Sequence, residues 1–222
     1  MLTVHHLNNS RSQRVLWLLE ELGVPYTLER YQRDPKTLRA PEALKSVHPL
    51  GKSPVITDEG ETIAESGAIA EYLLDRYGEG RLRPRPGSAE FRRYTYWLHY
   101  AEGSAMPPLL QKLVFLRIER TRAPWYARPV TRALTARVQA GFIDPEIASH
   151  ARHWEEALAR HPWFAGEEFS AADVQMSFPV EVVEARAAAG LGERTRAFLA
   201  RIRARPAYQR ALKSGGEFHI VG

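Results

Sequence analysis

Two short runs of residues have types and spacing that suit ligand binding. Lys52-Ser53-Pro54 places a proline at the start of a short apolar strand, where its missing N–H is tolerated. X-Pro is the one kind of bond in which a cis peptide costs only about 0.5–1 kcal/mol, and a cis bond would turn the backbone groups of Ser53 toward an extended peptide. Glu65-Ser66 opens an amphipathic helix, whose free N–H groups and positive dipole end attract a carboxylate. Together the two runs predict a site for a small anionic peptide.

At these residues the chain resembles the glutathione transferases. The similarity spans nearly the whole chain, and further motifs look like those of a bacterial and fungal branch of the family: His6-Leu7-Asn8-Asn9-Ser10-Arg11, Val15-Leu16-Trp17-Leu18-Leu19-Glu20, Ala40-Pro41-Glu42 and Tyr100-Ala101-Glu102-Gly103-Ser104. The resemblance implies an enzyme that adds the thiol of glutathione to small electrophiles or reduces hydroperoxides with it. Glutathione would then be the co-substrate, and a small hydrophobic electrophile the second substrate.

The resemblance also implies which residues hold glutathione. The loop at Ser53 and Pro54 would hold its cysteinyl backbone, and Ser66 and Glu65 would hold the carboxylate and ammonium of its γ-glutamyl end. Lys52 would pair with the glycyl carboxylate. Each residue also has an ordinary structural role, since a loop lysine is commonly solvated and an acidic residue is favoured in the first turn of a helix.

Thiol activation needs little from the protein. Lowering a thiol pKa by about two units requires about 2.7 kcal/mol of preference for the thiolate. One hydrogen bond to a charged group contributes about 1.5–3 kcal/mol, and a helix N-terminus adds up to about 1 kcal/mol. A hydroxyl or amide before the first helix therefore suffices without a general base. The match of the whole motif to its branch of the family favours Ser10 as the residue that activates the thiol. If the position of the serine in other members of the family is counted back from Arg14, it falls on Asn9 instead. Ser10 could also serve only as a helix cap.

The electrophile pocket is expected between the two domains, along a long helix. Its candidate lining residues are Tyr96, Tyr100, Met106, Pro107 and Leu110. An aromatic stripe on a helix is also typical of a hydrophobic core, and these residues do not identify the second substrate.

A second class of function is a non-catalytic regulatory or assembly module with the same fold. The intact set of candidate glutathione contacts favours the enzyme. The resemblance further implies a homodimer, in which the first domain of one subunit pairs with the second domain of its partner.

Composition excludes several alternatives. The 222 residues include no cysteine, which rules out disulfides, thiolate zinc sites and a cysteine nucleophile. Eight histidines are scattered without a His-x-x-x-His pair, so no metal site is expected. The net charge of +5 is dispersed along the chain, which argues against a nucleic-acid partner. Without a long apolar run or a signal-peptide pattern, we expect no membrane partner and a cytoplasmic location.

The elements that must position these residues follow from hydrophobic periodicity. Residues 1–77 alternate strand and helix patterns in the order β-α-β, then β-β-α, which predicts a thioredoxin-like α/β domain over residues 1–80. Within it, Gly23 is expected to end the first helix. A breaker-rich linker follows, and residues 88–222 read as an all-α domain. In that domain Pro107 should interrupt the long helix near Ser104, and Ser170-Ala171-Ala172-Asp173 predicts a helix capping box that serves folding.

Overall fold

The computed structural model describes residues 1–35, 37, 39–121, 124–186 and 190–216 of the chain. Its first part is a mixed sheet with helices. The elements in chain order are β1 (Thr3–Leu7), α1 (Ser12–Leu22), β2 (Thr27–Tyr31), the short 3₁₀ helix η1 (Glu42–Ser46), β3 (Val55–Asp58), β4 (Glu61–Ala64) and α2 (Ser66–Tyr77).

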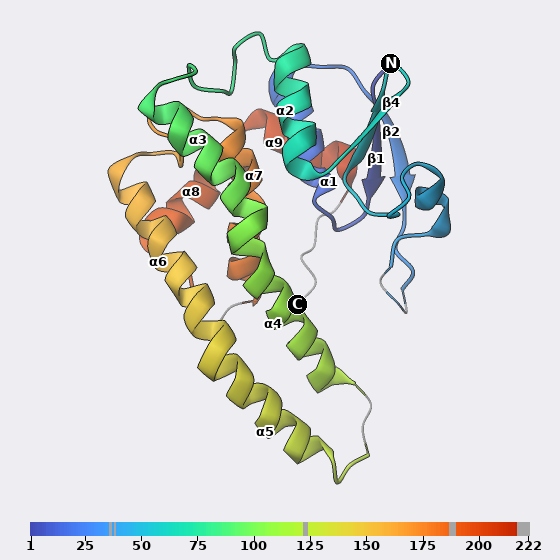
Figure 1. Cartoon of the computed structure of the whole chain (residues 1–222), viewed down its shortest axis with the longest axis vertical. Coiled ribbons are helices and arrows are strands. Elements are labelled where there is room, and N and C mark those ends of the chain that lie inside the picture. The colour runs from blue at the N-terminus through green and yellow to red at the C-terminus, as the bar shows by residue number, and fades with distance from the viewer. Residues whose placement is uncertain (36, 38, 122–123, 187–189, 217–222) are drawn as a thin grey trace.

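The four strands lie in the order β2-β1-β3-β4. β1 pairs in parallel with β2 and antiparallel with β3, and β3 and β4 form a hairpin. Val4 in β1 and Ile56 in β3 are fully buried, because α1 and α2 cover the face of the sheet that looks toward the rest of the molecule (Figure 1).

α1 forms as its sequence predicts. Val15, Leu16 and Leu19 are buried, and Gly23 ends the helix in a left-handed conformation (φ 68°) with its N–H bonded to the Leu19 carbonyl. A residue with a Cβ adopts this conformation only with strain, which explains the glycine.

Past residue 77 the chain runs without regular structure to Ser88, whose side chain accepts a hydrogen bond from the N–H of Phe91 at 3.0 Å. α3 (Ala89–Tyr100) then passes through a π-helical turn, η2 (Ala101–Ala105), into α4 (Met106–Arg120). Pro107 lies at the start of α4. The predicted interruption near Ser104 is confirmed, because the first turn of a new helix is where the missing N–H of a proline costs least.

The remaining elements are α5 (Arg128–Val138), the π-helical turn η3 (Gln139–Ile143), α6 (Asp144–Arg160), α7 (Ala171–Arg186), α8 (Glu193–Arg203) and α9 (Pro206–Gly215). Among the described residues after Ser88 the regular structure is helical only. The predicted fold class, a thioredoxin-like part followed by an all-helical part, is confirmed. The domain boundaries at residues 80 and 88 stay a prediction.

α7 packs against α1 and α2 of the first part of the chain and against α3, α4, α6 and α8 of the helical part. Its predicted capping box is formed in part, because the Asp173 carboxylate accepts hydrogen bonds from the N–H groups of Phe164 (2.8 Å) and Ser170 (2.9 Å). Burial raises the pKa of Asp173 to about 6, even though these bonds act in the opposite direction.

The C-terminal helix α9 packs back onto α1, as Figure 1 shows. The rings of Trp17 and Tyr208 meet edge to face with centroids 5.1 Å apart. Arg205 makes two hydrogen bonds with the Glu21 carboxylate, at 2.5 and 2.8 Å. These contacts join the two parts of the chain around one hydrophobic core.

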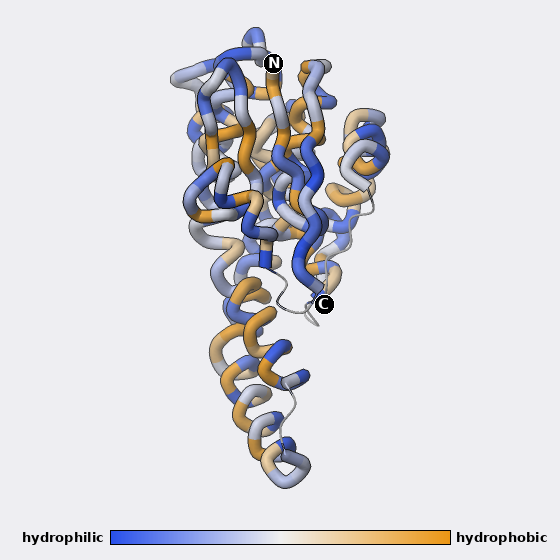
Figure 2. The backbone as a smooth tube through the Cα atoms, turned by 90° about the vertical axis from the view of Figure 1, so that its right-hand side faces the viewer, coloured by the Kyte–Doolittle hydropathy of each residue, from blue (hydrophilic) through white to orange (hydrophobic). Residues whose placement is uncertain are grey.

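α4 and α5 extend from the body as an antiparallel arm, and Figure 2 shows apolar positions along it. Large apolar side chains are exposed on the arm and the turn that follows it: Leu110, Val114, Ile118, Val130, Leu134, Val138 and Phe142. None of the described helices combines the length and apolar character that a membrane-spanning segment needs.

Candidate functional site

The predicted glutathione-binding residues come from three segments: the loop between β1 and α1, the loop before β3, and the start of α2. The Ser53–Pro54 peptide is cis. Ser53 Oγ lies 3.3 Å from Ser10 Oγ and donates to the His5 carbonyl at 3.3 Å. Two of the predicted residues that are distant in sequence therefore meet directly.

Ser10 is 4% exposed and accepts a hydrogen bond from the N–H of Ser12 at 3.2 Å. It thus stabilises the start of α1, as a cap would, and also presents its oxygen to Ser53. Asn9, the alternative candidate, adopts a left-handed conformation (φ 50°), which asparagine tolerates better than most residues. Before it, the Asn8 side chain accepts a hydrogen bond from the N–H of Arg33 at 2.8 Å, which fixes the loop against the segment after β2.

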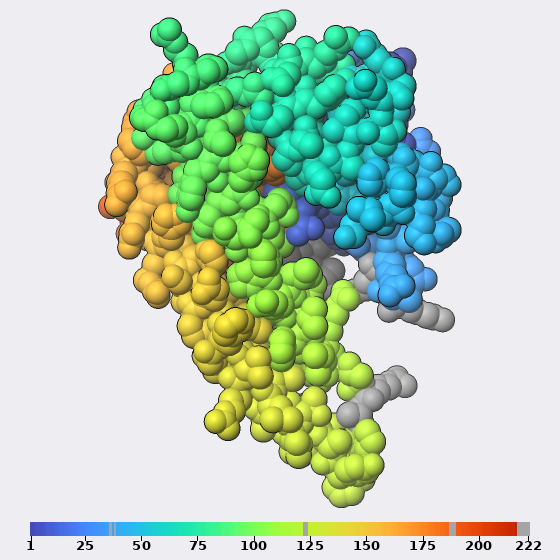
Figure 3. Space-filling model, in the orientation of Figure 1, coloured from blue at the N-terminus to red at the C-terminus, as the bar shows by residue number. Residues whose placement is uncertain are grey.

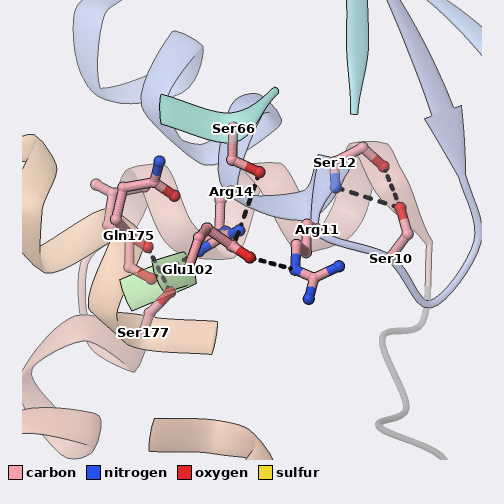
Figure 4. A network of polar contacts seen from close by, with 9 residues as sticks. Ser10, Arg11, Ser12, Arg14, Ser66, Glu102, Gln175 and Ser177 are labelled. Carbon is pink, nitrogen blue, oxygen red and sulfur yellow. Dashed lines mark hydrogen bonds and ion pairs between the residues drawn. The ribbon is translucent and has the colours of Figure 1, made fainter. Parts of the chain in front are cut away.

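Ser66 at the start of α2 is held by a residue that the sequence analysis did not single out. The Arg14 guanidinium donates to Ser66 Oγ at 3.1 Å and to the Gln175 carbonyl at 2.7 Å, and it pairs with the Glu102 carboxylate (Figure 4). Arg14 is 4% exposed. The buried guanidinium of Arg14 therefore connects α1 with α2, η2 and α7 through direct polar contacts.

Glu102 also pairs with Arg11, whose Nε lies 3.1 Å from its second oxygen. Burial alone would raise the pKa of Glu102, but Arg14 and Arg11 hold it below the usual value. Burial lowers the pKa of Arg14, and Glu102 acts against this shift. A buried cation is stable only when paired, so Glu102 keeps Arg14 charged beside Ser66.

Each residue of this pair has a separate signal in the sequence. Arg14 occupies a position next to the apolar residues of α1, and Glu102 lies inside one of the motifs on which the resemblance depends. Sequence periodicity could not show that the two side chains meet, because they are 88 residues apart.

Lys52 immediately precedes Ser53 and Glu65 immediately precedes Ser66, and both side chains are exposed. Glu65 adopts a positive φ of 72°, which is uncommon for a residue with a side chain. Non-glycine residues held in this region are enriched at ligand-binding sites, because the surrounding structure must maintain a conformation that the residue itself disfavours.

Two of the five candidates for the electrophile pocket, Tyr96 and Tyr100, lie on α3. Tyr100 pairs with His150 and accepts a hydrogen bond from Trp154 Nε1 at 3.2 Å, and Tyr96 Oη lies 3.1 Å from His153 Nε2. The two tyrosines therefore pack against α6.

The other three candidates lie on α4. Met106 is buried in the core, whereas Pro107 and Leu110 are exposed. In the space-filling view a hollow separates the green surface of α3 and α4 from the blue and cyan surface of the first part of the chain, and dark blue atoms are visible at its floor (Figure 3). In the ranges that the structure describes, no three His, Asp or Glu side chains gather in a way that could hold a metal ion.

Comparisons with known proteins identify the family of the chain. Residues 10–76 match the family model of the glutathione S-transferase N-terminal domain. Glutathione S-transferase 3 of Schizosaccharomyces pombe is 38% identical over 180 residues, which cover 81% of this chain and 73% of that protein. The chain belongs to the glutathione transferase family.

Other family members extend the likeness. Glutathione S-transferase 1 of Saccharomyces cerevisiae is 29% identical over 82% of this chain and 80% of its own length. A crystal structure of a glutathione S-transferase from Actinobacillus pleuropneumoniae superposes with a TM-score of 0.78 at 31% identity, over 97% of this chain and 93% of that one. The family resemblance inferred from the motifs is therefore confirmed.

Proposed function

We propose that this glutathione transferase family member is an enzyme that binds glutathione at the starts of α1 and α2 and ionises its thiol. The observation that carries the proposal is the meeting of Ser10 and Ser53, whose oxygens are 3.3 Å apart. A loop that holds the cysteinyl backbone beside Ser53 would place the cysteine sulfur near the Ser10 hydroxyl.

The two ends of glutathione would bind on either side of this pair. The γ-glutamyl carboxylate would accept hydrogen bonds from the Ser66 hydroxyl and from the first N–H groups of α2, where the helix dipole is positive. Because Ser66 Oγ already accepts a hydrogen bond from Arg14, its own proton is available to a ligand oxygen. Glu65 would bind the ammonium and Lys52 the glycyl carboxylate.

Ser10 is our candidate for stabilising the thiolate, with Asn9 as the alternative. The thiolate would receive one hydrogen bond and the field of the α1 N-terminus, which together supply about the 2.7 kcal/mol that a two-unit pKa shift requires. The thiolate would then attack a small electrophile or reduce a hydroperoxide, so neither reaction would need a base from the protein. Pro107 and Leu110, exposed at the start of α4, are the candidate residues that would contact an apolar second substrate.

A second function is a regulatory or assembly module that acts through protein contacts. The exposed apolar side chains of the α4–α5 arm favour this function, because a protein partner could cover them. It predicts that the chain binds protein partners whether or not it turns over glutathione.

Titration calorimetry of the full chain with glutathione and with S-methylglutathione tests binding. Assays with an aryl halide and with an organic hydroperoxide test catalysis. We expect both ligands to bind and at least one assay to show enzyme-dependent turnover. Absence of glutathione binding at millimolar concentration would refute the proposal, and binding without turnover of either substrate would favour the module.

A further inference from the structure

A chain of hydrogen bonds runs inward from Ser10. Ser10 Oγ lies 2.8 Å from Ser12 Oγ, which lies 2.8 Å from His6 Nδ1 (Figure 4 shows the two serines). Ser10 and His6 are each 4% exposed, and Ser12 is fully buried. These hydrogen bonds are shielded from bulk water, so water does not supply replacement donors or acceptors. The few protons on Ser10, Ser12 and His6 therefore determine which of the bonds can exist at the same time.

The tautomer of His6 determines which groups donate and which accept in this row of hydrogen bonds. A backbone contact at Gly215, at the end of α9, raises the pKa of His6, as a carbonyl does when it accepts a proton from the ring. Neutral His6 is therefore protonated on Nε2, and its Nδ1 is an acceptor.

Burial keeps His6 neutral by lowering its pKa to about 4, against the contribution of the Gly215 contact, and Arg30 on β2 acts in the same direction as burial. An imidazole with so low a pKa is neutral at pH 7 and too weak a base to keep a proton taken from a thiol. It cannot serve as the base that takes the thiol proton.

Counting the protons in this row of hydrogen bonds gives one consistent arrangement of donors and acceptors. Ser12 has a single hydroxyl proton, and His6 Nδ1 at 2.8 Å is a better acceptor for it than the Leu7 carbonyl at 3.4 Å. The short Ser10–Ser12 contact then requires the Ser10 hydroxyl to donate. In the ligand-free site the Ser10 proton points inward, and the single proton of the Ser53 hydroxyl is shared between the His5 carbonyl and Ser10 Oγ, which both lie 3.3 Å from Ser53 Oγ.

This arrangement opposes thiolate stabilisation, which requires the same proton to point at the sulfur. We propose that Ser12 competes with the bound glutathione thiolate for the single hydroxyl proton of Ser10, and that His6 holds Ser12 in the competing orientation. The inference depends on the proposed function of Ser10. Ser12 and His6 are then positioning residues that limit how far the thiol is acidified.

Removing the competitor should therefore strengthen thiolate stabilisation. In Ser12→Ala the Ser10 proton is free to turn to the sulfur, and the pKa of bound glutathione should fall by about 0.4–1 unit, the equivalent of one neutral hydrogen bond. His6→Phe should act in the same direction. Without its acceptor, Ser12 can donate to Ser10 and release the proton of Ser10.

The experiment measures the ultraviolet absorbance of the thiolate against pH, with glutathione saturating the wild-type chain, Ser12→Ala, His6→Phe, Ser10→Ala and the double variant Ser10→Ala/Ser12→Ala. We expect a lower thiol pKa in the first two variants, a higher one in Ser10→Ala, and the same value in the double variant as in Ser10→Ala. That last equality is what a merely structural role of Ser12 would not produce, because loss of packing would affect both backgrounds.

Several results would overturn the inference. An unchanged or raised thiol pKa in both Ser12→Ala and His6→Phe would show that Ser12 supports Ser10 and does not compete with the thiolate. An additive effect in the double variant would show that Ser12 acts without Ser10. If one variant fails to fold, the other still tests the direction of the shift. Failure of the wild-type chain to bind glutathione would instead refute the proposed function, and is visible in the same titration.

Discussion

The hydroxyl oxygens of Ser10 and Ser53 lie 3.3 Å apart although 43 residues separate them in the sequence. The sheet register explains the meeting. β1 and β3 are antiparallel with His5 opposite Val55, so the loop that leaves β1 and the loop that enters β3 emerge at the same end of the sheet. The thiol-activating candidate and the peptide-binding candidate are therefore fixed by two neighbouring strands.

Replacing each of the two candidates for thiol activation with alanine should separate their roles. Ser10→Ala is expected to raise the pKa of bound glutathione by roughly 1–2 units and to lower the rate near neutral pH about 10- to 100-fold, with little change in affinity. Asn9→Ala should have the smaller effect. A pH–rate profile of both variants is the measurement, and a shift in Asn9→Ala alone would assign the role to Asn9.

Ser66→Ala should weaken glutathione binding about 10- to 150-fold, because it removes a hydroxyl donor to a charged ligand group. Calorimetric titration measures the loss. Ser46→Ala, a substitution at an exposed serine at the end of η1, is the matched control and should bind as the wild-type chain does. Equal affinity of the two variants would exclude Ser66 from the site.

Arg14→Met should reduce the free energy of unfolding by about 3–5 kcal/mol, because it removes the cation that three groups share inside the protein. Arg11→Met should cost less than about 1 kcal/mol, since the Arg11–Glu102 pair is about one-third exposed on each side. Urea denaturation of both variants measures the difference. Similar losses would contradict the central place given to Arg14.

Glu181 gives the fold a pH dependence of defined sign. It is buried, accepts a hydrogen bond from Tyr208 Oη at 2.7 Å, and has a pKa raised by burial from 4.5 to about 7. Between these values the native state holds a proton that the unfolded state has lost, so this residue's contribution to stability falls as pH rises from about 4.5 to 7.

Glu181→Gln keeps an acceptor for Tyr208 and removes this titration. Relative to the wild-type chain, the variant should gain stability as pH rises from 5 to 8, with a change of order 3 kcal/mol. Denaturation at both pH values is the test. A constant difference between variant and wild type would show that Glu181 ionises normally in the folded protein.

We expect the chain to form a homodimer in solution. The family relationship supports this, as do the exposed apolar side chains on the α4–α5 arm, which a partner subunit could cover. Light scattering at micromolar concentration should give twice the mass of 25.2 kDa that one chain has. A monomer mass under these conditions would contradict the expectation.

Features that depend on neighbouring residues were predictable from the sequence. Gly23 ends α1, Pro107 lies in the first turn of α4, and the strand and helix order of the first part follows from apolar spacing. The reason is local. Backbone freedom, a missing N–H and the side-chain period of an element act over a few residues, so each leaves its signal in a short window of sequence.

Only the tertiary structure decided which side chains meet. Tyr100 pairs with His150, 50 residues away. Arg14 meets Glu102, 88 residues away, and Ser12 is connected to His6 because the start of α1 packs against β1. Such contacts depend on the orientation of whole elements around a shared core, and burial then requires each polar group to find a partner, whatever its distance along the chain.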